Sequence, residues 1–222
     1  MYGNSELKTV KVNNYDVRLE SYFNADDNAS VSLFYKDFKN HIELVRADGY
    51  SWQNVDNSYV AGIELEGKKM LTKKLEFRAN VTFVQSQTKY VRTRLEISNG
   101  IRNYIPLDSI KRSMYGQSPY VINAMLTYNF EKIGLTSTVS YNVQGPKLVI
   151  VSSVKEIPDI YEQPRHIIDV KFTKKLSDHF NLGLTVRDLL NTPTRKTYKG
   201  WDLDWENYRY GTSCSVSIAY RL

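Results

Sequence analysis

The sequence predicts an all-β protein: an antiparallel up-and-down transmembrane β-barrel, of which about nine strands are present. Two observations support this fold class. Apolar and polar residues alternate in nine stretches of the 222-residue chain, and short turns alternate with long polar connections between the stretches. The last stretch shows the alternation clearly, because Val216, Ile218 and Tyr220 fall on one face while Ser215 and Ser217 fall on the other.

The composition excludes several other classes of protein. Apolar runs such as residues 148–151 are far shorter than the roughly 20 residues that a membrane-spanning helix needs, which excludes a helical membrane protein. The polar residues after Met1 do not form a signal peptide, so an exported product either is targeted by another segment or begins upstream, and we expect the chain to be a fragment. The net charge of +6 is spread along the chain, and we expect no nucleic-acid partner.

Residues that could carry catalysis or bind a metal are scattered. Cys214 is the only cysteine, so neither an internal disulfide nor a thiolate metal cluster is expected. No serine lies in a nucleophile-elbow pattern, and we expect no enzymatic activity, no metal and no cofactor. The three histidines, His41, His166 and His179, lie on separate segments. The acidic group Asp202, Asp204 and Glu206 resembles part of a calcium loop but lacks the glycine and closing glutamate of that loop.

The order of turns and connections orients the expected strands. Short turns near residues 26, 72, 132 and 178 alternate with long connections near residues 50, 100, 155 and 200. In an antiparallel sheet these two sets lie at opposite rims, and outer-membrane barrels have short periplasmic turns and long extracellular loops. The expected strands are residues 16–23, 31–36, 61–66, 75–83, 122–130, 135–142, 168–173, 182–187 and 213–222.

Alternation alone leaves open whether the apolar face contacts lipid or the interior of a soluble sandwich or lipocalin-like barrel. Aromatic residues near the short turns, such as Phe23, Tyr128, Phe130 and Phe172, favour a membrane-interface girdle, although tyrosine also favours strands in general. The opposite face is charged and suits a wide, wet lumen. We expect Arg18, Glu64, Glu76, Arg78, Lys171 and Arg187 to face that lumen.

Several stretches of the sequence are similar to a known family, and together they cover nearly the whole chain. They are residues 4–8, 14–20, 31–40, 62–66, 188–191 (Asp-Leu-Leu-Asn) and 220–222. They resemble the C-terminal part of the barrel of TonB-dependent outer-membrane receptors. One departure is Leu222, since chains of this family usually end in an aromatic residue.

The resemblance implies a location and a set of partners. Barrels of this family have about 22 strands, so residues 1–222 would be the C-terminal part of one barrel domain, without the plug domain or signal peptide. A partial barrel with two open edges is not expected to transport by itself. The implied location is the cell outer membrane of a Gram-negative-type bacterium. The implied partners are membrane lipid and lipopolysaccharide, the TonB energy-transduction complex acting through the missing plug, and the barrel-assembly machinery at the C-terminal strand.

The resemblance also implies a function, the import of a scarce nutrient such as a ferric siderophore, cobalamin or a glycan. The connection after Gln85 is basic, with Lys111 and Arg112 near its end, and aromatic residues occur in the expected loops. These residues could bind an anionic ligand or stack on a sugar; alternatively they contact lipopolysaccharide phosphates and pack the loops. A β-domain without transport, either soluble or a simpler barrel, is the alternative function. The expected ligand-binding residues are Trp52, Arg92, Arg94, Arg102, Tyr104, Trp201 and Trp205.

Overall fold

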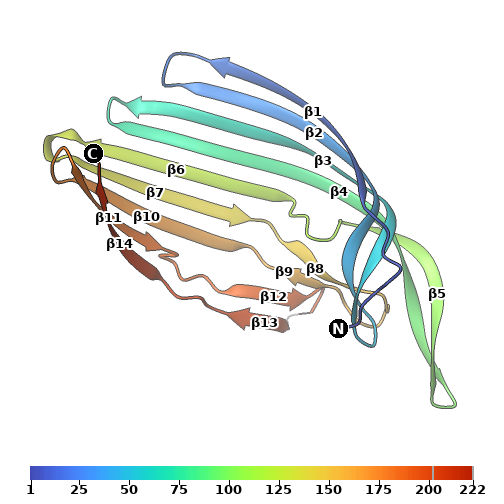
Figure 1. Cartoon of the computed structure of the whole chain (residues 1–222). Coiled ribbons are helices and arrows are strands. Elements are labelled where there is room, and N and C mark those ends of the chain that lie inside the picture. The colour runs from blue at the N-terminus through green and yellow to red at the C-terminus, as the bar shows by residue number, and fades with distance from the viewer. Residues whose placement is uncertain (202, 222) are drawn as a thin grey trace.

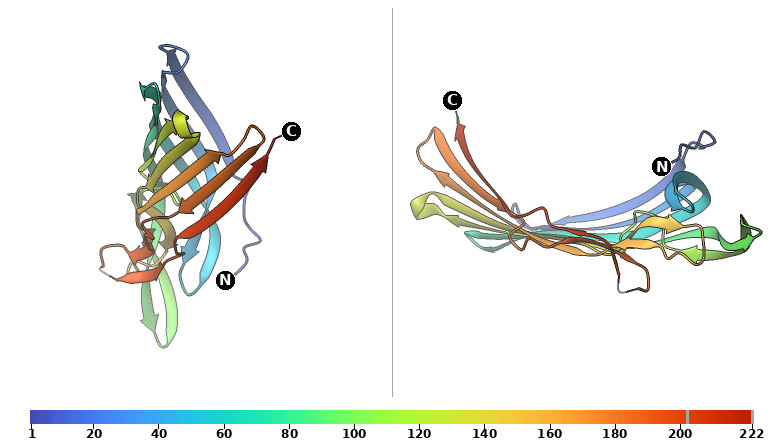
Figure 2. Two further views of the ribbon diagram at one scale, coloured as in Figure 1. Left: turned by 90° about the vertical axis from the view of Figure 1, so that its left-hand side faces the viewer. Right: turned by 90° about the horizontal axis from the view of Figure 1, so that it is seen from below.

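The protein is described by a computed structural model that covers residues 1–201 and 203–221. The chain forms one strongly curved sheet with open edges (Figure 1, Figure 2). Asp202, part of the acidic group noted above, and Leu222, the expected end of the last strand, lie outside the described residues. Among the residues described, no helix is long and apolar enough to cross a bilayer.

Nine strands follow one another across the sheet in chain order, each antiparallel to the next. They correspond one to one with the nine strands expected from the alternation, which confirms the fold class. Several are much longer than expected, reaching 24 residues in β4. The nine strands are β1 (Lys11–Tyr22), β2 (Asn28–Arg46), β3 (Tyr50–Thr72), β4 (Leu75–Ser98), β6 (Tyr120–Phe130), β7 (Leu135–Gln144), β10 (Arg165–Lys175), β11 (Phe180–Arg187) and β14 (Ser213–Tyr220).

The four short turns all lie at one rim, as the sequence predicts (Figure 1). The turn between β1 and β2 is an Asx turn, in which the Asn24 side chain accepts hydrogen bonds from the backbone amides of Asp26 and Asp27, both at 2.9 Å. Between β6 and β7 the chain passes through a short 3-10 helix, η1 (Glu131–Ile133), and leaves it at Gly134 with a φ of 60°. Local turn chemistry therefore defines this rim.

The long connections differ from the expected polar loops, because much of their length is also in strands. The expected loop at residues 46–57 is reduced to a tight turn at residues 47–49, since β2 and β3 continue as one long hairpin. Extending a hairpin pairs backbone amides and carbonyls that a loop would leave to water. The additional strands are β5 (Ile101–Arg112), β8 (Lys147–Ser152), β9 (Ile160–Glu162), β12 (Thr194–Tyr198) and β13 (Asp204–Tyr208).

The register of the nine strands gives the sheet one continuous apolar face. Leu19 pairs with Val31, Val31 with Leu65, Leu65 with Val81, and Val81 with Ile122. No second layer of the described chain packs over this face, and many of its large side chains are exposed, among them Ile218 at 70%. An apolar face without a protein cover is the arrangement that contact with lipid requires.

The buried core is small and lies toward the long connections rather than under the middle of the sheet. Val45 of β2 packs with Leu148 and Val151 of β8, and Tyr90 and Tyr161 pack against them. β8 reaches this place by pairing in parallel with the end of β2, where Val45 is opposite Val151. This cluster holds the connections against the sheet and so positions the candidate site.

Contact of the apolar face with lipid predicts a clear difference between two neighbouring residues of β7. Replacing Val139, which is exposed on the apolar face, by Arg should lower the free energy of unfolding in lipid vesicles by about 2–4 kcal/mol, because the charge would enter the bilayer. Ser140 faces the polar side, and Ser140→Arg should cost less than about 1 kcal/mol. Urea unfolding in vesicles measures both, and equal costs would contradict lipid contact.

Candidate functional site

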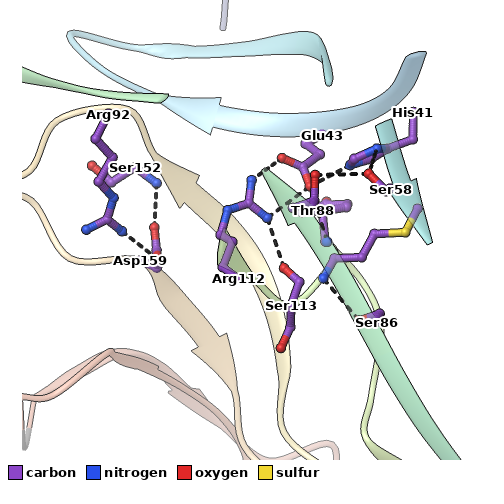
Figure 3. Close-up of polar contacts among 12 residues, drawn as sticks. His41, Glu43, Ser58, Ser86, Thr88, Arg92, Arg112, Ser113, Ser152 and Asp159 are labelled. Atoms are coloured by element: carbon purple, nitrogen blue, oxygen red, sulfur yellow. Dashed lines mark hydrogen bonds and ion pairs between the residues drawn. The ribbon is translucent and has the colours of Figure 1, made fainter. Parts of the chain in front are cut away.

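A buried ion pair joins β2 to the end of β5, and Figure 3 shows it with its neighbours. The Nη1 atom of Arg112 donates to Oε1 of Glu43 at 3.0 Å, and Nη2 donates to Oε2. The side chains of Arg112 and Glu43 are only 4% and 0% exposed. A bidentate ion pair of this kind fixes the relative position of β2 and β5, although Glu43 and Arg112 are 69 positions apart in the sequence.

The network continues from Glu43 through His41, Ser58 and Thr88. His41 Nε2 lies 2.7 Å from Glu43 Oε1, and His41 Nδ1 lies 2.6 Å from Ser58 Oγ. Serine, histidine and glutamate in a row resemble a hydrolase triad. However, Ser58 is only 4% exposed and its hydroxyl donates to Thr88 Oγ1 at 2.9 Å, so this serine is not presented to a substrate. The network is therefore suited to holding β2, β3, β4 and β5 together.

Burial and hydrogen bonding act in opposite directions on the ionisable groups of this network. Burial by itself would raise the pKa of the Glu43 carboxyl, but hydrogen bonds from His41 and Arg112 outweigh burial and the pKa is lowered. Burial raises the pKa of Tyr90 to about 12. The Arg112 guanidinium lies 4.8 Å from the centre of the Tyr90 ring, where it gains a cation–π contact.

A second, partly buried ion pair connects β4 to the segment between β8 and β9. Arg92 Nη2 donates to Asp159 Oδ2 at 2.7 Å, and the backbone amide of Ser152 donates to Asp159 Oδ1 at 2.9 Å. Next to Arg92, the amide of Thr93 donates to the carbonyl of Ser153 at 2.7 Å. In Figure 3 the Arg92–Asp159 pair is separate from the Glu43 network, and Arg112 is the member of that network drawn on the side of the pair.

Both arginines line a hollow of about 330 Å³, which we call the basic pocket. Three separate connections form its walls: the β4–β5 hairpin, the segment between β8 and β9, and the residues after β12. Five of its lining side chains are cationic and two, Glu156 and Asp159, are acidic. The lining includes Arg92, Lys111, Arg112, Lys155, Lys199 and Trp201.

The residues expected to bind ligand are not gathered in one place. Arg92 and Trp201 both line the basic pocket, although they are distant in sequence. Trp52, expected in a loop, lies in β3 and packs edge-on against Tyr115, with 6.2 Å between ring centres. Trp205 lies in β13, where Lys196 Nζ is 5.4 Å from the centre of its ring.

The remaining expected ligand residues lie on the β4–β5 hairpin, outside the basic pocket. Arg102 donates to Asp48 at the turn between β2 and β3. Hydrogen bonds from Tyr104 and Arg102 lower the pKa of the Asp48 carboxyl against the opposing effect of burial. Arg94 is exposed in β4. Lys155 and Lys199 line the basic pocket but were not expected, because an isolated lysine in a connection carries no local signal.

The six residues expected to face the lumen share the polar face of the sheet. One cross-strand row contains Arg18, Ser32 and Glu64, and another runs from Glu76 through Thr127 and Thr138 to Lys171. Arg78 donates to Glu76, and Arg187 is exposed at the end of β11. A hollow of about 540 Å³ lies over this face.

Side-chain hydrogen bonds run along the same polar face from strand to strand. Ser30 and Asn80 each donate to Glu66 at 3.1 Å, and Asn142 donates to Asn123 at 2.6 Å. These bonds satisfy polar groups that face neither lipid nor a protein core. Within the part of the chain that the structure describes, no group of three or more His, Cys, Asp or Glu side chains could hold a metal ion.

Nine consecutive antiparallel strands, short turns at one rim and an uncovered apolar face define the wall of an outer-membrane type of β-barrel. The chain belongs to the TonB-dependent receptors, since the family model described as "TonB dependent receptor-like, beta-barrel" matches residues 1–189. This family resides in the outer membrane of Gram-negative bacteria and serves nutrient uptake. The resemblance noted in the sequence is thus confirmed.

Solved structures share the fold. A ferric enterobactin receptor of Pseudomonas aeruginosa is 18% identical with a TM-score of 0.64, and the match covers 98% of this chain and 32% of that one. The copper transporter OprC is 14% identical with a TM-score of 0.67 and the same two coverages, 98% and 32%. The FrpB iron transporter of Neisseria meningitidis is 15% identical with a TM-score of 0.60, covering 98% and 31%. The chain therefore spans about a third of the length of these structures. No curated protein matches the chain by sequence.

The buried pair predicts a large and pH-dependent effect of Glu43→Gln. The substitution leaves Arg112 buried without a counter-charge and should lower the free energy of unfolding at pH 7 by about 3–5 kcal/mol. The pKa of Glu43 is lowered in the fold. Its contribution to the free energy of unfolding is therefore fully present above 4.5, the pKa of an unperturbed glutamate, and is lost as the pH falls from there through the lowered pKa. The difference between wild type and E43Q should therefore narrow on acidification.

Urea unfolding at pH 7 and at about pH 3.5 measures this difference. Glu156→Gln is the matched control, since Glu156 is exposed and the change should stay within about 0.5 kcal/mol. An E43Q variant as stable as E156Q at pH 7 would contradict the structural role of the pair.

Proposed function

We propose that this chain forms the C-terminal part of the barrel wall of a receptor that imports a scarce nutrient, such as a ferric siderophore, cobalamin or a glycan, across the outer membrane. The observation that carries the proposal is the uncovered apolar face running in register across nine strands, within a chain of this family. In the ordinary orientation of such barrels the short turns face the periplasm and the long connections face the outside. The polar face, with Arg18, Glu64 and Lys171, would then line the lumen.

The proposal includes the partners of the whole receptor. Within the described residues, the edge strands β1 and β14 each pair on one side only, so the open edges would be closed by further barrel strands. Transport would depend on a plug domain that engages the TonB complex, and assembly on recognition of the C-terminal strand by the barrel-assembly machinery. Membrane lipid would cover the apolar face, with lipopolysaccharide around the outer rim.

The long connections are the proposed ligand surface. The similar structures are those of a ferric enterobactin receptor, a copper transporter and an iron transporter. Of the residues expected to bind ligand, Arg92 and Trp201 share the basic pocket, which makes that pocket the best candidate for ligand contact on this part of the wall. An anionic iron chelate fits its charge better than neutral cobalamin or a neutral glycan does.

Deletion of the locus that encodes this chain tests the proposed uptake. In cells that lack it, uptake of one radiolabelled nutrient, tested among ferric enterobactin, cobalamin and maltoheptaose, should fall at least tenfold. Uptake should return with the wild-type gene and should require an intact TonB system. Unchanged uptake of all three probes, together with a protein that stays monomeric in solution without detergent, would instead support a β-domain without transport.

A further inference from the structure

The basic pocket holds more positive charge than the structure neutralises. The two acidic groups that serve its arginines are already engaged, Asp159 by Arg92 and Glu43 by Arg112. Among the described side chains, no carboxylate lies within ion-pair distance of Lys111, Lys155 or Lys199. Glu156 is the one other acidic side chain among the lining residues, so the three lysines outnumber the negative charge left to them, and this excess favours an anion between them.

The deeper part of the pocket lacks hydrogen-bond partners. The Nε atoms of Arg92 and Arg112 are buried and have no partner in the described structure, while both Nη atoms of Arg112 and the Nη2 atom of Arg92 are used in the two ion pairs. A buried N–H without an acceptor is costly, and arginine N–H groups match the oxygens of phosphate and carboxylate groups. Arg112 is held in place by Glu43 and by the Tyr90 ring, so it cannot simply turn toward water.

The walls of the pocket are connected through backbone hydrogen bonds, which makes the site a built one. The amide of Lys155 donates to the carbonyl of Thr93 at 2.9 Å, and the amide of Lys199 donates to the carbonyl of Asp159 at 2.8 Å. At the mouth, Trp201 is 55% exposed and lies against Tyr198, with 5.7 Å between ring centres. An exposed indole beside cationic groups provides a flat surface for a ring or sugar attached to the anion.

From these three observations we propose that the basic pocket binds a multiply charged oxyanion, carrying phosphate or carboxylate groups, between Lys111, Lys155 and Lys199 with the two arginines beneath. The site binds the anion whether or not the receptor transports it, so its test is independent of the uptake proposed above. Two sources share this chemistry: a soluble anion such as pyrophosphate or citrate, and the phosphates of lipid A.

The test measures binding to the protein extracted from outer membranes in detergent. Pyrophosphate and citrate are titrated by calorimetry and by quenching of tryptophan fluorescence, and bisphosphorylated lipid A is compared with its dephosphorylated form in mixed micelles. The triple variant K111Q/K155Q/K199Q should bind the anion about 100-fold more weakly, since three charge-assisted contacts are lost. K155Q alone, at an exposed site, should weaken binding by roughly tenfold.

The matched control is K8Q/K73Q/K132Q, which removes the same charge at exposed lysines that do not line the pocket and should bind as wild type does. Trp201→Phe should abolish the fluorescence change but leave the calorimetric signal. Binding of pyrophosphate or citrate assigns a soluble ligand, and binding of bisphosphorylated lipid A alone assigns a lipid headgroup. The proposal is overturned if no probe binds, or if the control loses as much affinity as the pocket variant, because binding would then follow net charge alone.

Discussion

The two-residue period of the strands, kept in register across nine neighbours, is the constraint on which the rest of the structure depends. Each strand places every second side chain on the same face, so one row of paired residues can be wholly apolar while the next is polar. The row from Leu19 to Ile122 and the row from Glu76 to Lys171 are examples. A shift of one residue in any strand would exchange its two faces, placing charge on the apolar side of the sheet.

This constraint leaves the middle of the sheet without a buried core, and the core appears where the constraint ends. Beyond the apolar band the strands continue as hairpins, and there Val45, Leu148 and Val151 pack together. The ion pair of Glu43 and Arg112 lies beside this cluster, and its position there explains why the pair is buried although it belongs to the long connections. Packing and charge therefore act together on the part of the molecule that forms the candidate site.

The parts of the fold that could be predicted from the sequence are those determined locally. Alternation defines the faces of β6 from its own residues, and Asn24 defines the first short turn through bonds to its neighbours. The strands within the connections depend on distant partners: β8 pairs with β2 about 100 positions earlier, and Thr93 bonds to Ser153 sixty positions later. The basic pocket draws on three such connections, so neither Lys155 nor Lys199 could be assigned to it from the sequence.

Because the long connections are largely hydrogen-bonded hairpins, they offer few sites at which a protease can bind and cleave the chain. A protease must draw a stretch of extended, unpaired backbone into its cleft, and residues already paired within a hairpin cannot enter without local unfolding. The β4–β5 hairpin pairs from Ser98 with Ile101 down to Thr88 with Arg112, which leaves its tip at Asn99 and Gly100 as the accessible point. Cleavage there would cut the β4–β5 hairpin at its tip and leave the walls of the basic pocket joined to the sheet.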